Sequence, residues 1–118
     1  MKKITLLLLL FLVMVLSSCM EDAKITVQNN VQNAKLERIS WDNYSVASSL
    51  MTGESRGITV SDYKSDFPKT SVVKFLMTRG GNQVYLETKS TFTLDINDNL
   101  LIVISDTTEV INPALQGR

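Results

Sequence analysis

Two carboxylates, Asp62 and Asp66, lie four residues apart in a stretch that also contains Tyr63, Lys64 and Phe67. A pair of carboxyl groups about 5–10 Å apart can act as the acid and the base of glycoside hydrolysis. The sequence shows no feature that would set one of these two groups apart from the other, as that chemistry requires. Surface charges around a proline-containing turn are therefore the simpler interpretation. A small hydrolase that uses Asp62 and Asp66 stays open as the second alternative function.

A second polar cluster, the run from Asp95 to Asn99, places oxygen-bearing side chains at positions 1, 3 and 5 of an EF-hand calcium loop. Such a loop requires glycine at position 6 and a bidentate glutamate at position 12. Leu100 and Asp106 occupy those two positions here. We therefore expect a polar hairpin tip between two strands, where Asn and Asp tolerate left-handed backbone angles, and no bound metal.

Four aromatic side chains could form a platform that stacks on sugar rings: Trp41, Tyr44, Tyr63 and Tyr85. Trp41 and Tyr44 share their alternation phase with neighbouring apolar residues, which predicts that they pack in the core. Tyr63 in its loop and Tyr85 on its strand are expected to face solvent as candidate ligand-facing aromatics. A glycan-binding module of a surface polysaccharide system is therefore the first alternative function.

Several kinds of reactive residue are scarce. The chain contains no histidine and one cysteine, which excludes Cys/His zinc sites, Cys–His and Ser–His nucleophilic pairs, and intrachain disulfides. Acidic and basic residues balance, with 12 of each and no long run of Lys or Arg, so we expect no nucleic-acid binding. We predict that the protein is not an enzyme and takes no cofactor.

The single cysteine, Cys19, follows a short apolar segment. Lys2 and Lys3 precede an apolar run from Ile4 to Leu16, which is shorter than the 18 or more residues of a spanning helix. The stretch Leu16-Ser17-Ser18-Cys19 resembles the lipobox of bacterial lipoproteins, in which a signal peptidase cuts before a cysteine that carries lipid. The resemblance implies a cleaved signal helix over residues 1–18 and a covalent lipid on Cys19, held in the membrane by more than one acyl chain.

Glu21 and Asp22 follow this cysteine closely. In Bacteroides-type lipoproteins, acidic residues at the first positions after the lipidated cysteine resemble a surface-export signal, and the match here is partial because Met20 comes first. A solvated acidic spacer over residues 19–23 is the alternative interpretation. The expected location is the outer membrane, with the protein lipid-anchored on its periplasmic or surface-exposed face.

The rest of the chain alternates between apolar and polar residues with a period of two, which is typical of β-strands. Paired glycines at 80–81 favour a tight hairpin, and 61–70 reads as the longest loop. The run Leu100–Ile104 is apolar on both faces, which predicts a fully covered strand. Strands are expected at 25–31, 36–41, 44–50, 57–60, 72–78, 83–89, 92–96 and 100–104. We predict an all-β domain over 24–111, followed by a flexible tail over 112–118. The domain is expected to be an antiparallel sandwich of seven or eight strands that is immunoglobulin-like or transthyretin-like, with a compact barrel as the alternative.

Short motifs along this domain resemble those of small Bacteroides-type lipoproteins, a group without an established activity. They are Ile25-Thr-Val-Gln-Asn29, Ile39-Ser-Trp41, Thr52-Gly-Glu-Ser55, Tyr85-Leu-Glu-Thr88 and Ile104-Ser-Asp106. The resemblance implies a β-sandwich and carries over no catalytic or ligand residue.

Together these patterns favour a non-enzymatic accessory or protein-interaction module of the cell envelope. Its expected partners are membrane lipid, through the anchor, and a protein of the envelope, because unpaired edge strands can accept an added strand. A glycan is the partner in the first alternative.

Overall fold

The computed structural model describes residues 20–116. Ten strands lie within this range, together with a 3-10 turn and one helical turn. They are β1 (Met20–Asn30), β2 (Lys35–Trp41), β3 (Tyr44–Leu50), β4 (Ser55–Tyr63), η1 (Lys64–Asp66), β5 (Lys69–Ser71), β6 (Val73–Arg79), β7 (Asn82–Thr88), β8 (Phe92–Leu94), β9 (Asn99–Ser105), β10 (Val110–Ile111) and α2 (Pro113–Gln116). The predicted signal peptide, residues 1–18, and Cys19 lie outside the described residues.

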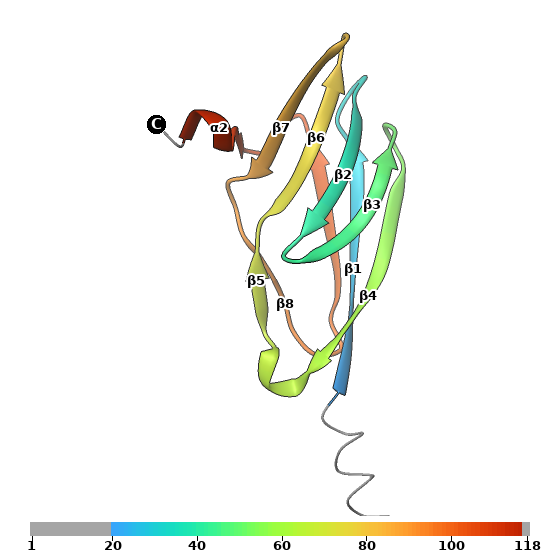
Figure 1. The fold of residues 1–118 in the computed structure, drawn as a ribbon. Helices are drawn as coiled ribbons and strands as arrows, with labels where there is room; N and C mark the ends of the chain where they lie inside the picture. The colour runs from blue at the N-terminus through green and yellow to red at the C-terminus, as the bar shows by residue number, and fades with distance from the viewer. Residues whose placement is uncertain (1–19, 117–118) are drawn as a thin grey trace, which may run out of the picture.

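The strands form a β-sandwich, which confirms the predicted fold class. One sheet has three strands in the order β4-β1-β9, and the facing sheet has five in the order β10-β7-β6-β2-β3. β5 and β8 make a small third sheet at the lower end of the molecule in Figure 1. The pairing is antiparallel throughout except between β1 and β9, which run parallel.

β1 begins earlier than the sequence predicted. Met20 already pairs with Tyr63, and the antiparallel register with β4 continues through Ala23 opposite Val60. The alternation of buried positions extends back to Ala23, which is buried, and β4 is long enough to pair with it. Residues 20–23, expected as part of an acidic spacer, are therefore folded into the sheet.

The predicted loop over 61–70 contains more regular structure than expected. β4 continues through Tyr63, η1 follows, and β5 begins at Lys69 after a cis peptide bond between Phe67 and Pro68. Phe67 is buried in the core. The segment therefore passes beneath the sandwich and leads the chain from one sheet to the other.

The turns follow the residue types available to them. Gly80 and Gly81 have φ values of 58° and 82° and close the β6–β7 hairpin, as predicted. The turn after Asp95 differs from the prediction, because it is not a hairpin tip: β8 pairs with β5, whereas β9 pairs with β1. At the other terminus, α2 occupies part of the stretch expected as a flexible tail.

A single buried core fills the space between the two larger sheets. Its largest fully buried side chains include Trp41, Phe75 and Leu36. The indole Nε1 of Trp41 donates a hydrogen bond to the carbonyl oxygen of Ser71 at 3.2 Å, so burial does not leave this donor unpaired. Trp41 therefore lies in the core, as its alternation phase predicted.

β9 contradicts the prediction of a fully covered strand. Ile102 and Ile104 are buried, but Leu101 is 57% exposed and Val103 is 41% exposed. β9 is an edge strand of the three-stranded sheet, and a two-layer sandwich covers only the inner face of each sheet. Apolar residues on both faces of this strand therefore leave one apolar face toward solvent.

Candidate functional site

Asp62, the first residue of the candidate carboxylate pair, is held by several contacts at the end of β4. Lys69 Nζ lies 2.8 Å from Asp62 Oδ2, and the Tyr44 hydroxyl donates to the same oxygen at 3.4 Å. The backbone N–H of Tyr63 donates to Oδ1 at 2.8 Å. The hydrogen bond from Lys69, followed by that from Tyr63, lowers the pKa of Asp62 to about 2, and the same partnership raises the pKa of Lys69.

This geometry favours a structural role for Asp62 over catalysis. A carboxyl group with a pKa of about 2 is ionised near neutral pH, so Asp62 cannot supply the proton of a general acid. Its oxygens are committed to groups on β3, β4 and β5. Asp66 lies exposed on η1, and its side chain makes a smaller contribution to lowering the pKa of Asp62. The pair therefore does not resemble an acid and a base held across a cleft.

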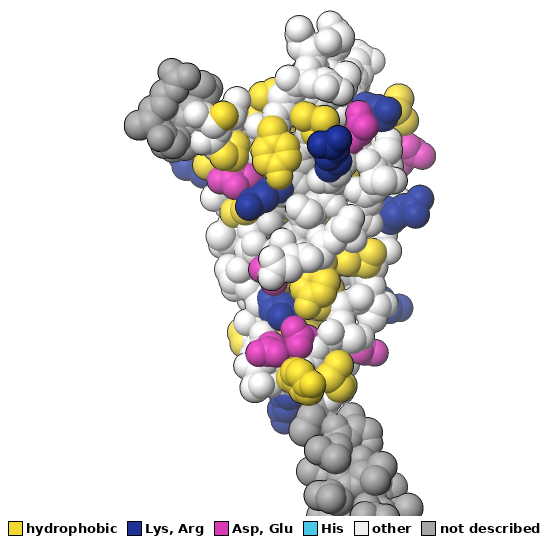
Figure 2. All heavy atoms as spheres, viewed as in Figure 1, with side chains coloured by type: hydrophobic (Ala, Val, Ile, Leu, Met, Phe, Trp, Pro, Cys, Tyr) yellow, Lys and Arg dark blue, Asp and Glu magenta, His cyan; other side chains and the backbone are white. Residues whose placement is uncertain are grey.

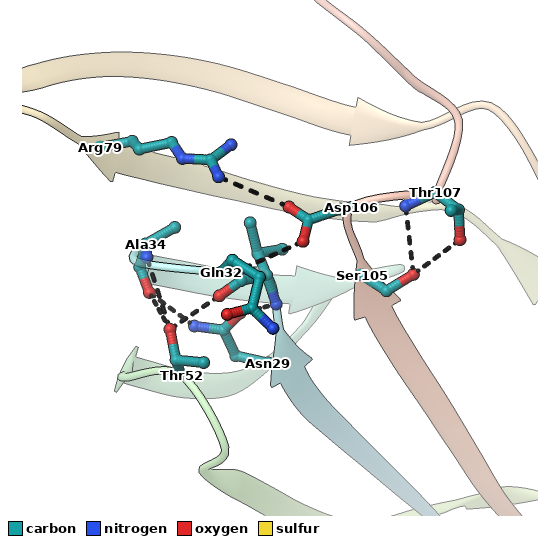
Figure 3. Close-up of polar contacts among 9 residues, drawn as sticks. Asn29, Gln32, Ala34, Thr52, Arg79, Ser105, Asp106 and Thr107 are labelled. Carbon is teal, nitrogen blue, oxygen red and sulfur yellow. Dashed lines mark hydrogen bonds and ion pairs between the residues drawn. The ribbon is translucent and has the colours of Figure 1, made fainter.

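The length of β9 separates Asp106 from the run Asp95–Asn99, so these residues do not form a calcium-binding loop. Asp95 and Asp98 form a self-contained turn, in which Asp98 Oδ2 accepts a 2.8 Å hydrogen bond from the Asp95 N–H. Asp106 lies beyond the far end of β9, where Oδ1 is 3.7 Å from Arg79 and Oδ2 accepts from the Gln32 N–H at 3.3 Å (Figure 3). Within residues 20–116, no cluster of three or more His, Cys, Asp or Glu side chains is arranged to hold a metal ion.

Of the four aromatic residues, Trp41 is buried as its alternation predicted, Tyr44 is only half-buried against the core, and Tyr63 and Tyr85 face solvent. Trp41 and Tyr44 stack with ring centroids 6.4 Å apart, whereas Tyr63 is 57% exposed and Tyr85 is 44% exposed. The two exposed rings belong to different sheets, because Tyr63 ends β4 and Tyr85 lies within β7. The lower end of β4 and the upper position of β7 are far apart in Figure 1. They therefore do not form one platform for a sugar.

Glu21 and Asp22, the candidate export signal, are part of β1. Glu21 lies opposite Asp62 and Asp22 opposite Ser61 in the β1–β4 register. Asp22 Oδ1 accepts a 2.6 Å hydrogen bond from the Ser61 hydroxyl, and its carbonyl oxygen accepts from the Asn97 N–H at 2.9 Å. In the folded domain this acidic pair is therefore a fixed part of the sheet rather than a loose spacer.

The outer face of the three-stranded sheet has exposed apolar side chains along its β9 edge. Leu101 and Val103 of β9 lie beside Thr26 and Gln28 of β1. Farther across, Gly57 of β4 pairs with Thr26, and a Cβ at this glycine would lie 2.6 Å from Thr26 Oγ1. Because the residues at the centre of this face are small or polar, an open hollow of about 290 Å³ lies around Gly57.

The edge of this sheet at β9 is the open side of the sandwich. On the opposite side, β3 and β4 run next to each other and close the two sheets (Figure 1). β9 pairs only with β1 in the part of the chain that the structure describes. From Asn99 to Ser105, β9 contains no charged residue and no proline. Charged side chains and proline are the usual devices that protect an edge strand from pairing.

A small cavity lies between the sheets near the end of β9. It measures about 110 Å³, and apolar side chains from both sheets line most of it, among them Phe75, Met77, Leu86 and Ile104. Arg79 and Asp106 also line it. The apolar surface at this edge therefore includes both the outward side chains of β9 and a recess beside its last residues.

Sequence reasoning missed this edge, although its signal was present. A run that is apolar on both faces indicates either a strand covered on both faces or an edge strand whose outer face binds another protein. The sequence alone does not distinguish these two cases.

No protein-family model, curated protein or solved structure matches this chain. None of the helices in residues 20–116 has the length and apolar character needed to span a bilayer.

Proposed function

We propose that the protein is a lipid-anchored envelope lipoprotein that acts as a non-enzymatic interaction module. In this proposal Cys19 carries the lipid, and the free edge of β9 binds an extended segment of another envelope protein. The observation that carries the proposal is the uncharged, unprotected edge of β9 with Leu101 and Val103 exposed. The lipobox-like stretch before Met20 supports the anchor.

The chemistry of the edge defines the partner. A strand added to β9 gains main-chain hydrogen bonds, while its alternate side chains reach the two faces of the sheet. Side chains on the outer face would contact Leu101 and Val103, and one on the inner face would approach the recess beside Ile104. The partner segment is therefore an extended stretch with apolar residues on both faces. It needs no charged residue, because β9 itself contains none.

The direction of β9 argues against a second copy of this chain as the occupant. β9 runs parallel to β1, and β1 starts directly after the anchoring cysteine. Antiparallel pairing of two β9 strands would turn the second domain end for end. Its own Cys19 would then point away from the membrane that holds the first copy, so a different protein is the better fit.

Site-specific crosslinking in intact cells tests this proposal. A photo-crosslinking residue at Val103 should give an adduct with a different polypeptide, and the crosslinked segment should be extended and apolar. The same residue at Thr59, exposed on β4 at the opposite edge of that face, is the matched control and should give no such adduct. Leu101→Lys should abolish the adduct at position 103. Adducts that are identical at both positions, that contain only this chain, or that survive Leu101→Lys would refute the assignment.

The anchor is tested separately by the mass of the N-terminal peptide. The mature protein should begin at Cys19 and carry diacylglyceryl and acyl groups, and Cys19→Ser should lose this added mass and leave the membrane fraction. A wild-type peptide that retains residues 1–18, or that carries no lipid, would refute this part of the proposal.

A further inference from the structure

We infer that one end of the domain rests directly on the bilayer surface, with Met20 and Tyr63 in the headgroup region; this inference rests on the lipid anchor proposed above. We call this the basal end, formed by residues 20–24, 61–69 and 95–98. The segments meet through the β1–β4 register and through hydrogen bonds from the Asn97 N–H to the Asp22 carbonyl oxygen and from the Lys24 N–H to the Asp98 carbonyl oxygen.

The length of chain between the anchor and the fold carries the inference. Met20 is the first residue of β1 and already pairs with Tyr63. Consecutive Cα atoms are about 3.8 Å apart, so a lipid on Cys19 would hold the start of β1 at the membrane with no spacer between them. A lipoprotein with a long linker could hold its domain well above the bilayer. Here no linker residue separates Cys19 from β1, so the domain would stay at the surface.

The side chains at this point suit an interface between water and lipid. Met20 is 47% exposed and Tyr63 is 57% exposed. As register partners on adjacent strands they project from the same face. Figure 2 shows apolar side chains at the lower end of the molecule, where Figure 1 places the start of β1. Tyrosine, with an apolar ring and a polar hydroxyl, is enriched at the headgroup level of membranes.

The charges at the basal end limit how the contact arises. The three segments contain six acidic residues, Glu21, Asp22, Asp62, Asp66, Asp95 and Asp98, and three basic ones, Lys24, Lys64 and Lys69. An acidic surface is repelled by anionic lipid rather than attracted to it. The basal end would therefore not recruit the domain to a membrane by itself. The anchor brings it there, and the absence of a spacer keeps it in contact.

Fluorescence quenching by spin-labelled headgroups tests this placement. The lipidated protein is reconstituted in phosphatidylcholine vesicles with a fluorophore on Tyr63→Cys or, as the matched control, on the exposed but distant Tyr85→Cys. Because the diacylglyceryl group would occupy the sulfur of Cys19, each introduced cysteine is the only free thiol. We expect the label at position 63 to lose most of its fluorescence and the label at position 85 to keep it. A flexible Gly/Ser insertion between Cys19 and Met20 should restore the fluorescence at position 63 without releasing the protein from the vesicles.

The possible failures of this experiment are distinguishable. If the protein floats with the vesicles but both labels stay bright, the anchor stands and the basal contact is refuted. If the protein does not float with the vesicles, the anchor itself is refuted, and the basal contact with it. Equal quenching at both positions would mean that the domain lies flat on the membrane, which also overturns the inference.

Discussion

The side-chain amide of Asn29 donates a 2.9 Å hydrogen bond to the carbonyl oxygen of Leu50, which joins β1 of one sheet to β3 of the other through the core. The same Nδ2 donates to the Ala34 carbonyl oxygen at 3.0 Å, and Oδ1 accepts from the Val31 N–H at 2.9 Å. Figure 3 shows this side chain directed toward the chain around Ala34 and Thr52. Every hydrogen-bonding atom of this buried amide group thus has a partner. Its loss would take one hydrogen bond from each of three backbone groups, of which the Ala34 carbonyl oxygen keeps a second donor in the Thr52 hydroxyl at 3.2 Å.

Asn29→Ala should therefore lower the free energy of unfolding by about 3 kcal/mol, because buried donors and acceptors left without partners each cost about 1–3 kcal/mol. Urea unfolding of the Cys19→Ser protein measures this change. Asn30→Ala, at the exposed neighbouring position, is the control and should change stability by less than about 0.5 kcal/mol. Equal effects of the two substitutions would show that the amide does not hold the sheets together.

Gly57→Ala should be destabilising by about 1–2 kcal/mol, since the added methyl group would meet Thr26 Oγ1 at 2.6 Å and overpack this contact. Thr26→Ala removes the atom in conflict, so the double variant should recover most of the loss. A double-mutant cycle monitored by chemical denaturation gives the coupling between the two sites. Purely additive effects would mean that the penalty has another source, such as the backbone of β4.

The contact between Asp62 and Lys69 should make the stability of the folded domain depend on pH in the acidic range. Because the pKa of Asp62 falls from 3.8 to about 2 in the folded protein, the contact stabilises fully above pH 3.8 and is lost as the pH falls through about 2. Asp62→Asn should therefore be less stable than wild type at neutral pH, and the difference should shrink toward pH 2. Thermal unfolding across this range measures the difference, with Asp42→Asn, an exposed carboxylate in the turn between β2 and β3, as the control. A difference that is independent of pH would exclude the ion pair as its cause.

Without the lipid anchor proposed above, the protein should associate through β9. No anchor would then fix the direction of the domain, and an uncharged edge strand is a template for pairing. The Cys19→Ser protein should form oligomers at high concentration in sedimentation experiments, and Val103→Lys should keep it monomeric. Because Val103 faces outward, this substitution should change the stability of the monomer by less than about 0.5 kcal/mol. Oligomers that are unaffected by Val103→Lys would place the contact elsewhere.

Residue alternation predicted much of the fold because burial in a sandwich repeats every two residues. β2, β3, β6 and β7 lie within a residue or two of the predicted ranges, and the glycine hairpin between β6 and β7 was also predicted correctly. The inward phase of Trp41 and the outward phase of Tyr85 followed from the same pattern, whereas the exposure of Tyr63 was predicted from its place in an expected loop. These features depend on local sequence alone.

The features that were missed depend on pairing between distant segments. The early start of β1 requires β4 to extend to Tyr63, and the contact from Asp62 to Lys69 requires the chain to turn back after η1. The exposure of Leu101 depends on the place of β9 at the edge of its sheet, which no pattern within β9 encodes. Sequence alone therefore predicted the strands better than the surfaces they form.

The central position of β1 determines how the domain would respond to force. A pull on Cys19 would enter the fold at Met20 and run along β1, which is paired with β4 at nine positions and with β9 at seven. Hydrogen bonds between strands lie across the direction of the chain, so this pull would load them all together in shear instead of peeling them apart one by one. A partner held along β9 would extend the same path of tension. With the anchor and the β9 partner proposed above, force between the two would therefore cross the sheet as shear on the hydrogen bonds of β1.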